Sequence, residues 1–310
     1  MVSISDTFFI HENVSYNKFI VSDIDNSYAS RGASVIPEFK DGHTNYEENL
    51  QYPLTFYRCR VDKQKKLSRT EMLNIPLNKR SLCASERFSI PGIPCLYLGV
   101  TSYCCWKEVG CPSEYLLSSF RLKKKRKNLR ILNLVLSQAL LNGRLSSPCQ
   151  DWSDLEEEIL AFFPIVLATA FHVENHNSEN YHSEYTIANL IMNCLYDLKI
   201  DGIAYFSAKN ASEFDYPYGV NLAIPILGTD NEQIIRQSFE VSDPCRIKMC
   251  ELDNPHIKYD KESYINHIYK NDEDNGFVSL NGTRKPYQEL YFSKLDNFVA
   301  STPFKDISIS

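Results

Sequence analysis

The sequence predicts an α+β protein in which short strands and interspersed helices build one sheet. Apolar runs of strand length support this prediction: LTFYRCRV at 54–61, CLYLGV at 95–100 and GVNLAIPI at 219–226. The stretch 184–199 instead has apolar residues at helical spacing. The regular alternation of strands and helices that builds a parallel sheet is not evident, and no G-x-G-x-x-G motif occurs. We therefore expect a compact α+β sheet rather than a doubly wound fold.

The first strand and its successor are expected to bring charged and aromatic side chains together. In the strand at 54–61, Phe56, Arg58 and Arg60 fall on one face. The strand at 95–100 is entered through a Pro-Gly turn at 91–92, since this dipeptide is a strong turn signal. The sequence thus predicts one strand that carries two arginines and a second strand that is preceded by a Pro-Gly turn.

A short helix is predicted directly after the second strand. Thr101 or Ser102 can cap its start, because their hydroxyls accept hydrogen bonds from the first free backbone N–H groups. Gly110 fits the position just after its end, and Pro112 prevents continuation. Glu108 then lies in the last turn, where a carboxylate costs about 0.3–1 kcal/mol relative to a cation. A residue that is unfavourable for the helix is a candidate for a site.

The remaining elements are predicted in order along the chain. Residues 120–136 are interpreted as a hairpin whose tip is the basic run KKKRKN, and a capping box at Ser153-x-x-Glu156 predicts a helix near 154–163. After the helix at 184–199, IAYFS is a short strand that follows Asp201-Gly202. We divide the chain into an N-terminal extension at 1–50, a catalytic domain at 51–230 and a C-terminal annex at 231–310 packed on that domain.

Composition and sequence patterns indicate which kinds of binding partner and which cellular compartment to expect. The chain of 310 residues has 33 basic and 39 acidic residues, a net charge of −6, which gives no overall attraction to nucleic acid or anionic membrane. We see no pattern of a signal peptide and no apolar run of membrane-spanning length, so we expect a cytoplasmic protein whose ten cysteines are reduced and mostly buried.

Five short motifs occur in one order: FYRCR, ERFSIPGIPCLY, CCWKE, EYTIAN and DGIAYFS. In this order and spacing, over roughly 54–226, the chain resembles the RES-domain family. The resemblance implies an ADP-ribosyltransferase-like fold, an NAD-degrading activity and the role of a toxin paired with an antitoxin. Two departures from the family pattern concern pocket polarity: Ser89 stands for the usual asparagine, and Ala188-Asn189 stands for Pro-Gln.

The resemblance and the chemistry of NAD nominate the same side chains. A carboxylate, here Glu108, would stabilise the positive charge that develops on the ribose when the nicotinamide leaves. Arginine forks suit a diphosphate, and a tyrosine offers a flat face to a base. The resulting catalytic candidates are Arg58, Glu108 and Ser207, and the candidates that bind NAD are Arg58, Arg60, Arg87, Tyr97 and Ser207.

Each candidate also has a purely structural interpretation. Glu108 could be a solvated surface residue, Arg58 a salt-bridge partner at a sheet edge, and Arg87 a cap for the turn carbonyls. Likewise, Tyr97 could be plain core packing and Ser207 a turn residue. The spacing His172-x-x-x-His176 suits a metal only on a helix, and the asparagines around it indicate a loop, so we expect no metal.

The expected substrate is NAD, with transfer of ADP-ribose to water or phosphate. The alternatives are an ADP-ribosyltransferase that modifies a macromolecule, or a non-enzymatic binding module that uses the basic hairpin at 121–130. Nucleic-acid binding by that hairpin is disfavoured because few aromatic residues interleave with its charges. An antitoxin or sensor protein is the expected protein partner, and no membrane partner is expected.

Overall fold

The structure of the chain is a computed structural model. It describes residues 21–24, 55–61, 67–123, 129–135, 163–171, 182–208, 218–252, 277–280 and 283–307. Nearly all of the N-terminal extension at 1–50, most of the predicted helix at 154–163, the tip of the basic run and the histidines at 172 and 176 lie outside these residues.

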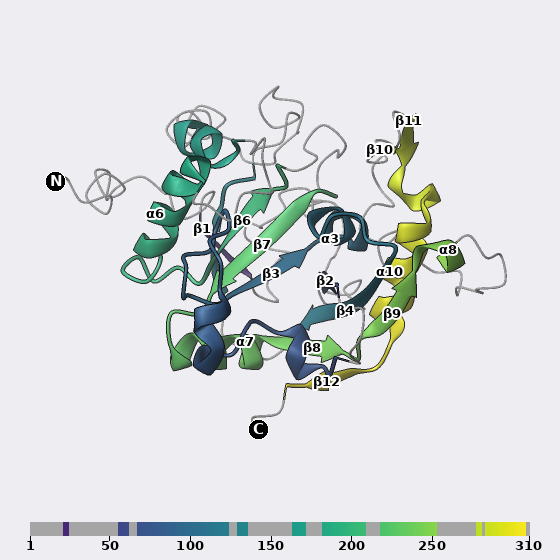
Figure 1. The fold of residues 1–310 in the computed structure, drawn as a ribbon, viewed down its shortest axis with the longest axis horizontal. Coiled ribbons are helices and arrows are strands. Elements are labelled where there is room, and N and C mark those ends of the chain that lie inside the picture. The colour runs from purple at the N-terminus through teal and green to yellow at the C-terminus, as the bar shows by residue number, and fades with distance from the viewer. Residues whose placement is uncertain are drawn as a thin grey trace, which may run out of the picture.

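Ten strands of the described residues form one large sheet (Figure 1). The order across it is β1-β5-β6-β7-β3-β2-β4-β8-β12, and β9 also pairs with β4. The parallel pair is β5 with β6, and the other pairs described are antiparallel. The strands are β1 (Val21–Ile24), β2 (Thr55–Arg60), β3 (Cys95–Gly99), β4 (Glu114–Leu122), β5 (Leu129–Asn133), β6 (Gly202–Phe206), β7 (Val220–Pro225), β8 (Phe239–Ser242), β9 (Cys245–Lys248) and β12 (Phe304–Asp306). A mostly antiparallel sheet with helices confirms the α+β prediction.

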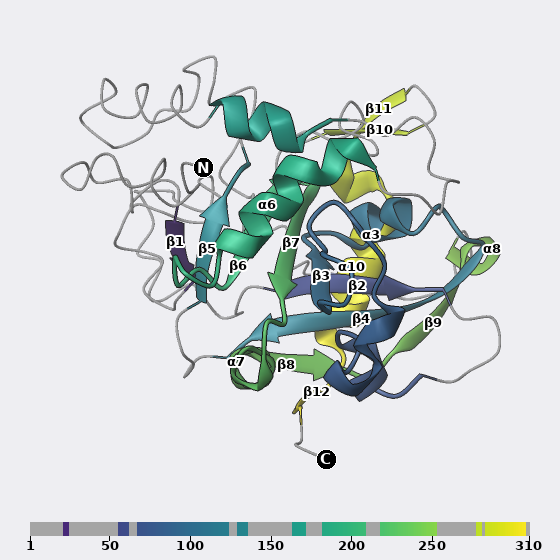
Figure 2. The same ribbon diagram turned by 60° about the vertical axis from the view of Figure 1, so that its left-hand side comes forward.

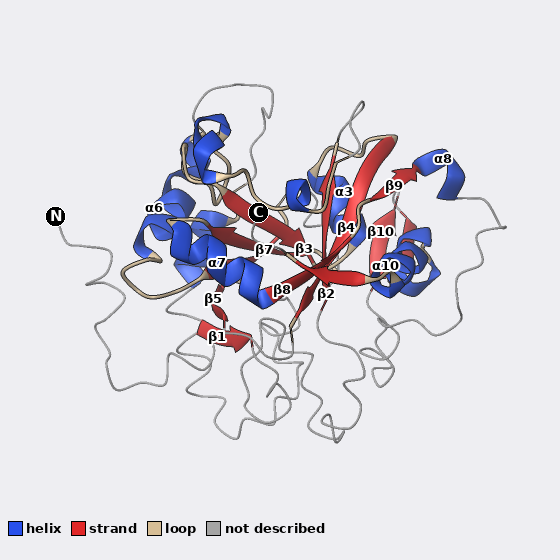
Figure 3. Ribbon diagram, turned by 90° about the horizontal axis from the view of Figure 1, so that it is seen from below, coloured by secondary structure: helices blue, strands red, loops and turns tan. Residues whose placement is uncertain are grey.

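The helices flank this sheet, with α6 and α10 toward opposite ends of the molecule (Figure 3). The α-helices are α3 (Ser102–Glu108), α6 (Thr186–Cys194), α7 (Thr229–Ser238), α8 (Met249–Leu252), α10 (Tyr291–Ser301) and a further helix at 163–169. The 3-10 helices are η3 (Thr70–Met72), η4 (Leu77–Leu82), η5 (Ser183–Tyr185) and η6 (Tyr287–Glu289), and β10 (Phe277–Leu280) pairs with β11 (Thr283–Pro286) in a separate hairpin.

Side chains alternate between the two faces of the central strands. Leu96 and Leu98 of β3 join a core on one face, together with Leu222 of β7 and Phe239 of β8. The opposite face of β3 and β7 packs against α6 and the helix at 163–169. Farther along this second face, α3 and α10 cover β2 and β4. Leu96, Leu98 and Leu222 thus lie on one face of the sheet, and Tyr97, Tyr205 and Ala223 lie on the other.

The sheet changes direction between β2 and β3. These strands share one registered pair, Tyr57 with Gly99, whereas β2 and β4 share six, from Thr55 with Arg121 to Arg60 with Leu116. In Figure 2, β2, β4 and β8 accordingly run across the direction of β7. In a full ladder, the backbone groups of β3 would bind the backbone of β2. Because the two strands share one registered pair, side chains of β2 near this junction can reach those groups of β3 instead.

The hairpin predicted at 120–136 is wrong. β4 lies between β2 and β8, and β5 lies between β1 and β6, so the two strands do not pair. The prediction followed the rule that consecutive strands usually lie side by side, but both Ile131 and Leu132 of β5 are buried and need neighbours on both faces. Two residues at the start of the basic run also bind within the molecule: Arg121 stacks on Phe304, with 3.7 Å to the ring centroid, and Lys123 pairs with Asp306.

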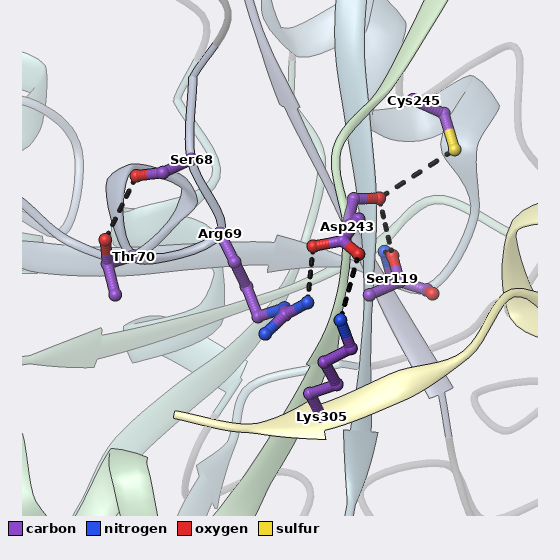
Figure 4. Close-up of polar contacts among 8 residues, drawn as sticks. Ser68, Arg69, Thr70, Ser119, Asp243, Cys245 and Lys305 are labelled. Atoms are coloured by element: carbon purple, nitrogen blue, oxygen red, sulfur yellow. Dashed lines mark hydrogen bonds and ion pairs between the residues drawn. The ribbon is translucent and has the colours of Figure 1, made fainter. Parts of the chain in front are cut away.

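Apart from the β10–β11 hairpin, the strands described in 231–310 belong to the same sheet. β8 and β9 pair with β4, β12 pairs with β8, and α10 packs on α3. At the surface, Asp243 pairs with Arg69 and lies 3.7 Å from Lys305 of β12 (Figure 4). Exposed ion pairs of this kind contribute little stability, so the packing of α10 and the strands holds this region. The boundary at 230 between a catalytic domain and an annex stays a prediction.

Neither a membrane span nor a disulfide occurs in the described part of the chain. No helix there combines enough length with enough apolar character to cross a bilayer. The nine described cysteines are free thiols. They are less buried than expected: Cys59, Cys104 and Cys105 are buried, whereas Cys111 and Cys250 are exposed.

Candidate active site

Glu108 is the last residue of α3, and the predicted caps fix that helix. The Thr101 hydroxyl accepts a hydrogen bond from the backbone N–H of Cys104 at 3.1 Å and donates to the carbonyl of Tyr218 at 2.8 Å. After the helix, Gly110 has a φ of 83°, the left-handed conformation that a helix end requires and glycine adopts most easily. Both cap predictions are confirmed, and they determine where Glu108 stands.

The carboxylate of Glu108 is held by two neighbouring strands. The Ser207 hydroxyl, just after β6, donates to Oε1 of Glu108 at 2.6 Å, and the Asn221 amide of β7 donates to the same oxygen at 2.8 Å. Ser207 is fully buried and Asn221 is 4% exposed, while Glu108 itself is half-buried. Glu108 is therefore an anchored carboxylate, which argues against a solvated surface residue.

Arg58 is a half-buried cation at the junction of β2 and β3. Its Nη1 donates to the carbonyl of Tyr97 at 3.0 Å, and its Nε is buried with no hydrogen-bond partner. Burial lowers the pKa of Arg58 to about 9, and the positive charge of Arg60 adds to that effect. Among the described residues no carboxylate forms an ion pair with it, and β2 is an inner strand, which argues against a salt bridge at a sheet edge. An anion placed beside Arg58 would offset the cost of its burial.

Arg60 and Arg87 bind backbone carbonyls. Arg60 donates to the carbonyl of Leu73 at 2.7 Å, next to η3, and burial lowers its pKa. Arg87 donates through Nη1 to Thr169 at 2.8 Å and through Nη2 to Phe171 at 2.9 Å. It thus ties down the end of the helix at 163–169 rather than capping the Pro-Gly turn. Its guanidinium also lies 5.7 Å from the ring centroid of Tyr185, in cation–π range.

Tyr97 and Ser89, which both follow Arg87 in the sequence, contact each other through their hydroxyls. The Tyr97 hydroxyl donates to Oγ of Ser89 at 2.9 Å. Burial raises the pKa of Tyr97, and nearby Cys95 and Tyr205 add to this. Ser89, which stands where the family has asparagine, therefore supplies the acceptor that fixes the Tyr97 ring.

Tyr205 lies near both Glu108 and Arg87. Its pKa is raised by burial and further by the charge of Glu108, whereas the charge of Arg87 lowers it. Its ring lies 4.5 Å from that of Phe88, centroid to centroid. Arg58 of β2, Tyr97 of β3, Tyr205 of β6 and Glu108 of α3 thus form a row in which each residue lies near the next, with Arg87 beside it. Arg60 is directed toward η3 instead.

Sequence reasoning missed three members of this site: Asn221, Tyr205 and Tyr185. The two tyrosines stand within motifs that the sequence had already singled out, DGIAYFS and EYTIAN. Asn221 had a signal of its own, because it is the polar residue in the otherwise apolar strand sequence GVNLAIPI. A buried polar group must find a partner, and that partner is Glu108.

The chain is similar to a candidate toxin and to one chain of a solved toxin–antitoxin complex. The chain is 28% identical over 213 residues to a candidate toxin, YopC, of Bacillus subtilis (strain 168). That alignment covers 64% of this chain and 47% of YopC, so the chain spans about half the length of this relative.

The crystal structure of the M. tuberculosis MbcT–MbcA toxin–antitoxin complex matches 64% of this chain and 85% of the matched chain, with a TM-score of 0.34 and 15% identity. A likeness of that degree supports no argument about shared geometry. The RES domain itself matches residues 55–240, which include every candidate residue named above. The chain belongs to the RES-domain family.

Proposed function

We propose that this protein consumes NAD by cleaving the bond between nicotinamide and ribose and passing ADP-ribose to water or phosphate. The observation that carries the proposal is the anchored carboxylate of Glu108 at one end of a row whose other end is a half-buried arginine, Arg58. NAD offers matching charges, a cationic nicotinamide ribose and an anionic diphosphate. Family membership supports the same substrate, because RES domains are NAD-degrading enzymes by the resemblance described above.

The chemistry assigns one task to Glu108. When the glycosidic bond breaks, its electron pair leaves with the nicotinamide, which becomes neutral, and positive charge develops on the ribose. A fixed carboxylate stabilises that charge most when it needs no reorganisation during the reaction. An oxygen of water or phosphate then bonds to the ribose carbon, and water loses a proton in that step. The hydrogen bonds from Ser207 and Asn221 supply the fixed geometry.

The three arginines would contribute to different degrees to binding of the diphosphate. Arg58 is the stronger candidate, because it is half-buried without an acidic partner among the described residues and its buried Nε has no hydrogen-bond partner. Arg87 would contribute its charge while its terminal nitrogens keep the segment 163–171 in place. Arg60 would act through Arg58, whose pKa it lowers. Tyr97 would present its ring to a base of NAD, and Ser207 would act chiefly by holding Glu108.

The biological role we propose is that of a toxin, because loss of NAD stops much of metabolism. The likeness to a candidate toxin of Bacillus subtilis supports this role. An antitoxin or sensor protein would then restrain the enzyme until it is needed. Expression of the chain in a bacterial host should lower cellular NAD and halt growth, and a Glu108→Gln variant should do neither.

The direct test mixes the purified protein with NAD and measures free nicotinamide, with and without phosphate. We expect release of nicotinamide, with ADP-ribose as the second product in hydrolysis and ADP-ribose 1-phosphate in phosphorolysis. Label from NAD that remains on a macromolecule would instead identify an ADP-ribosyltransferase. No release of nicotinamide by folded protein under any of these conditions would overturn the proposal.

A further inference from the structure

The side chain of Asn221 lies between two residues of α3. The Cys104 thiol donates to its Oδ1 at 3.3 Å, and its Nδ2 donates to Oε1 of Glu108 at 2.8 Å. Cys104 and Glu108 are four residues apart, so they share one face of the helix. A single buried amide therefore bridges the helix face that carries the carboxylate.

The sheet leaves space for this amide. In the register of the sheet, Asn221 pairs with Gly99 on one side and Tyr205 on the other. A Cβ atom on Gly99 would lie 3.2 Å from Oδ1 of Asn221 and 2.6 Å from Sγ of Cys105. Glycine at this position is thus what allows α3 and the amide to lie close to the strand.

The orientation of the amide follows from its neighbours. A carboxylate only accepts hydrogen bonds, so the amide nitrogen must face Glu108 and the carbonyl must face the thiol. Turning the amide over would lose both contacts. The amide and the Ser207 hydroxyl approach the same oxygen of Glu108 from two different strands. Two donors on one oxygen restrict how the carboxylate can rotate.

We propose that Asn221 is a positioning residue for Glu108 in the cleavage of NAD. The inference rests on the proposed function of the site and adds a residue and a role to it. Asn221 is 4% exposed, so it acts through Glu108 rather than by touching NAD. Its loss should therefore lower the rate of the chemical step and leave substrate affinity nearly unchanged.

The sharpest variant is Asn221→Asp, which keeps size and shape but replaces the donor by an acceptor with negative charge. We expect kcat for nicotinamide release to fall about 10- to 100-fold, with KM for NAD within about twofold. The acid side of the pH–activity profile should also move to higher pH, since a second carboxylate disfavours the ionised form of Glu108. Among the described residues, Glu108 raises the pKa of Cys104, Tyr185 and Tyr205, and the variant leaves these three groups in place.

Two further variants make the test decisive. Gln237→Glu makes the same amide-to-carboxylate change on the exposed side of α7 and should leave kcat, KM and the pH profile unchanged. If Asn221→Asp fails to fold, as judged by circular dichroism and melting temperature, Asn221→Ala replaces it. It should show the same loss of kcat without the shift of the acid side.

Wild-type kcat in folded Asn221→Asp or Asn221→Ala would overturn the inference. A raised KM with unchanged kcat would also overturn it, because Asn221 would then act in binding NAD. Failure of the wild-type protein to release nicotinamide would instead overturn the proposed function, so the two failures are distinguishable.

Discussion

Glu108 and Arg58 carry opposite charges and have different surroundings. Glu108 receives two hydrogen bonds from the protein, at 2.6 and 2.8 Å. Arg58 is half-buried, donates to one carbonyl, and has no carboxylate partner among the described residues. Buried charges without a partner are expensive, and proteins retain them mostly at functional sites. At the scale of single residues, the site thus combines the carboxylate of Glu108, which the protein holds in place, with the guanidinium of Arg58, which has no anionic partner among the described residues.

Replacing Arg58 by lysine should weaken binding of NAD. Lysine keeps the charge but cannot form the two parallel hydrogen bonds of a guanidinium to a phosphate. We expect KM for NAD to rise about tenfold or more, with a smaller change in kcat, and we expect ADP-ribose to stabilise the variant less than wild type in a melting experiment. Arg80→Lys, at an exposed position of η4, is the matched control. An unchanged KM in Arg58→Lys would speak against a phosphate-binding role.

At the scale of elements, α3 is fixed at both ends and from the side. Thr101 caps its start, Gly110 ends it, and Asp296 of α10 accepts the backbone N–H of Ser102 at 2.9 Å. Asp296 also accepts the Tyr287 hydroxyl at 2.6 Å. The two local caps could be predicted because they depend on neighbouring residues. Asp296 could not, because its partner lies 194 residues away in the sequence.

Asp296 should make stability depend on pH. Burial raises its pKa to about 7, whereas the unfolded chain has about 3.9. Between these values the folded protein binds the proton more tightly, so the free energy of unfolding falls as pH rises from about 4 to about 7. Urea unfolding at pH 5 and pH 8 measures this fall, which should be about 2–3 kcal/mol larger in wild type than in Asp296→Asn. Parallel pH curves for the two proteins would show that Asp296 does not carry the effect.

The approach of α3 to the sheet can be tested at Gly99. A methyl group there would meet Cys105 Sγ at 2.6 Å, so α3 or the strand must shift. We expect Gly99→Ala to lower the free energy of unfolding by about 1–3 kcal/mol and to reduce nicotinamide release, because Asn221 and Glu108 lose their alignment. Gly228→Ala is the control, since a Cβ there meets nothing within 4 Å. Equal stability of the two alanine variants would contradict the close packing of α3.

At the scale of the whole molecule, local patterns predicted the strands but not their partners. The runs at 54–61, 95–100 and 219–226 became β2, β3 and β7, and the period at 184–199 became α6. The order of strands, the separation of β4 from β5 and the bend between β2 and β3 depend on contacts between distant segments. β8 and β12 have four and three residues, too few for a periodic signal.

For the candidate site too, local motifs could be predicted from the sequence, whereas contacts between distant segments could not. Motif order nominated Arg58, Glu108 and Ser207, which the fold brings into one row with Tyr97 and Tyr205. It could not show that Ser207 binds Glu108, or that the terminal nitrogens of Arg87 bind Thr169 and Phe171. Those partners are fixed by packing across the sheet and not by spacing along the chain.

Comparison of wild type with Glu108→Gln tests the central claim most directly. Glutamine keeps the shape of the side chain and can still accept from Ser207, but it lacks the negative charge. We predict that the rate of nicotinamide release falls at least about 100-fold while the melting temperature changes little, and that Glu240→Gln, a half-buried glutamate of β8, retains the wild-type rate. Release of nicotinamide by folded Glu108→Gln at the wild-type rate would contradict the account.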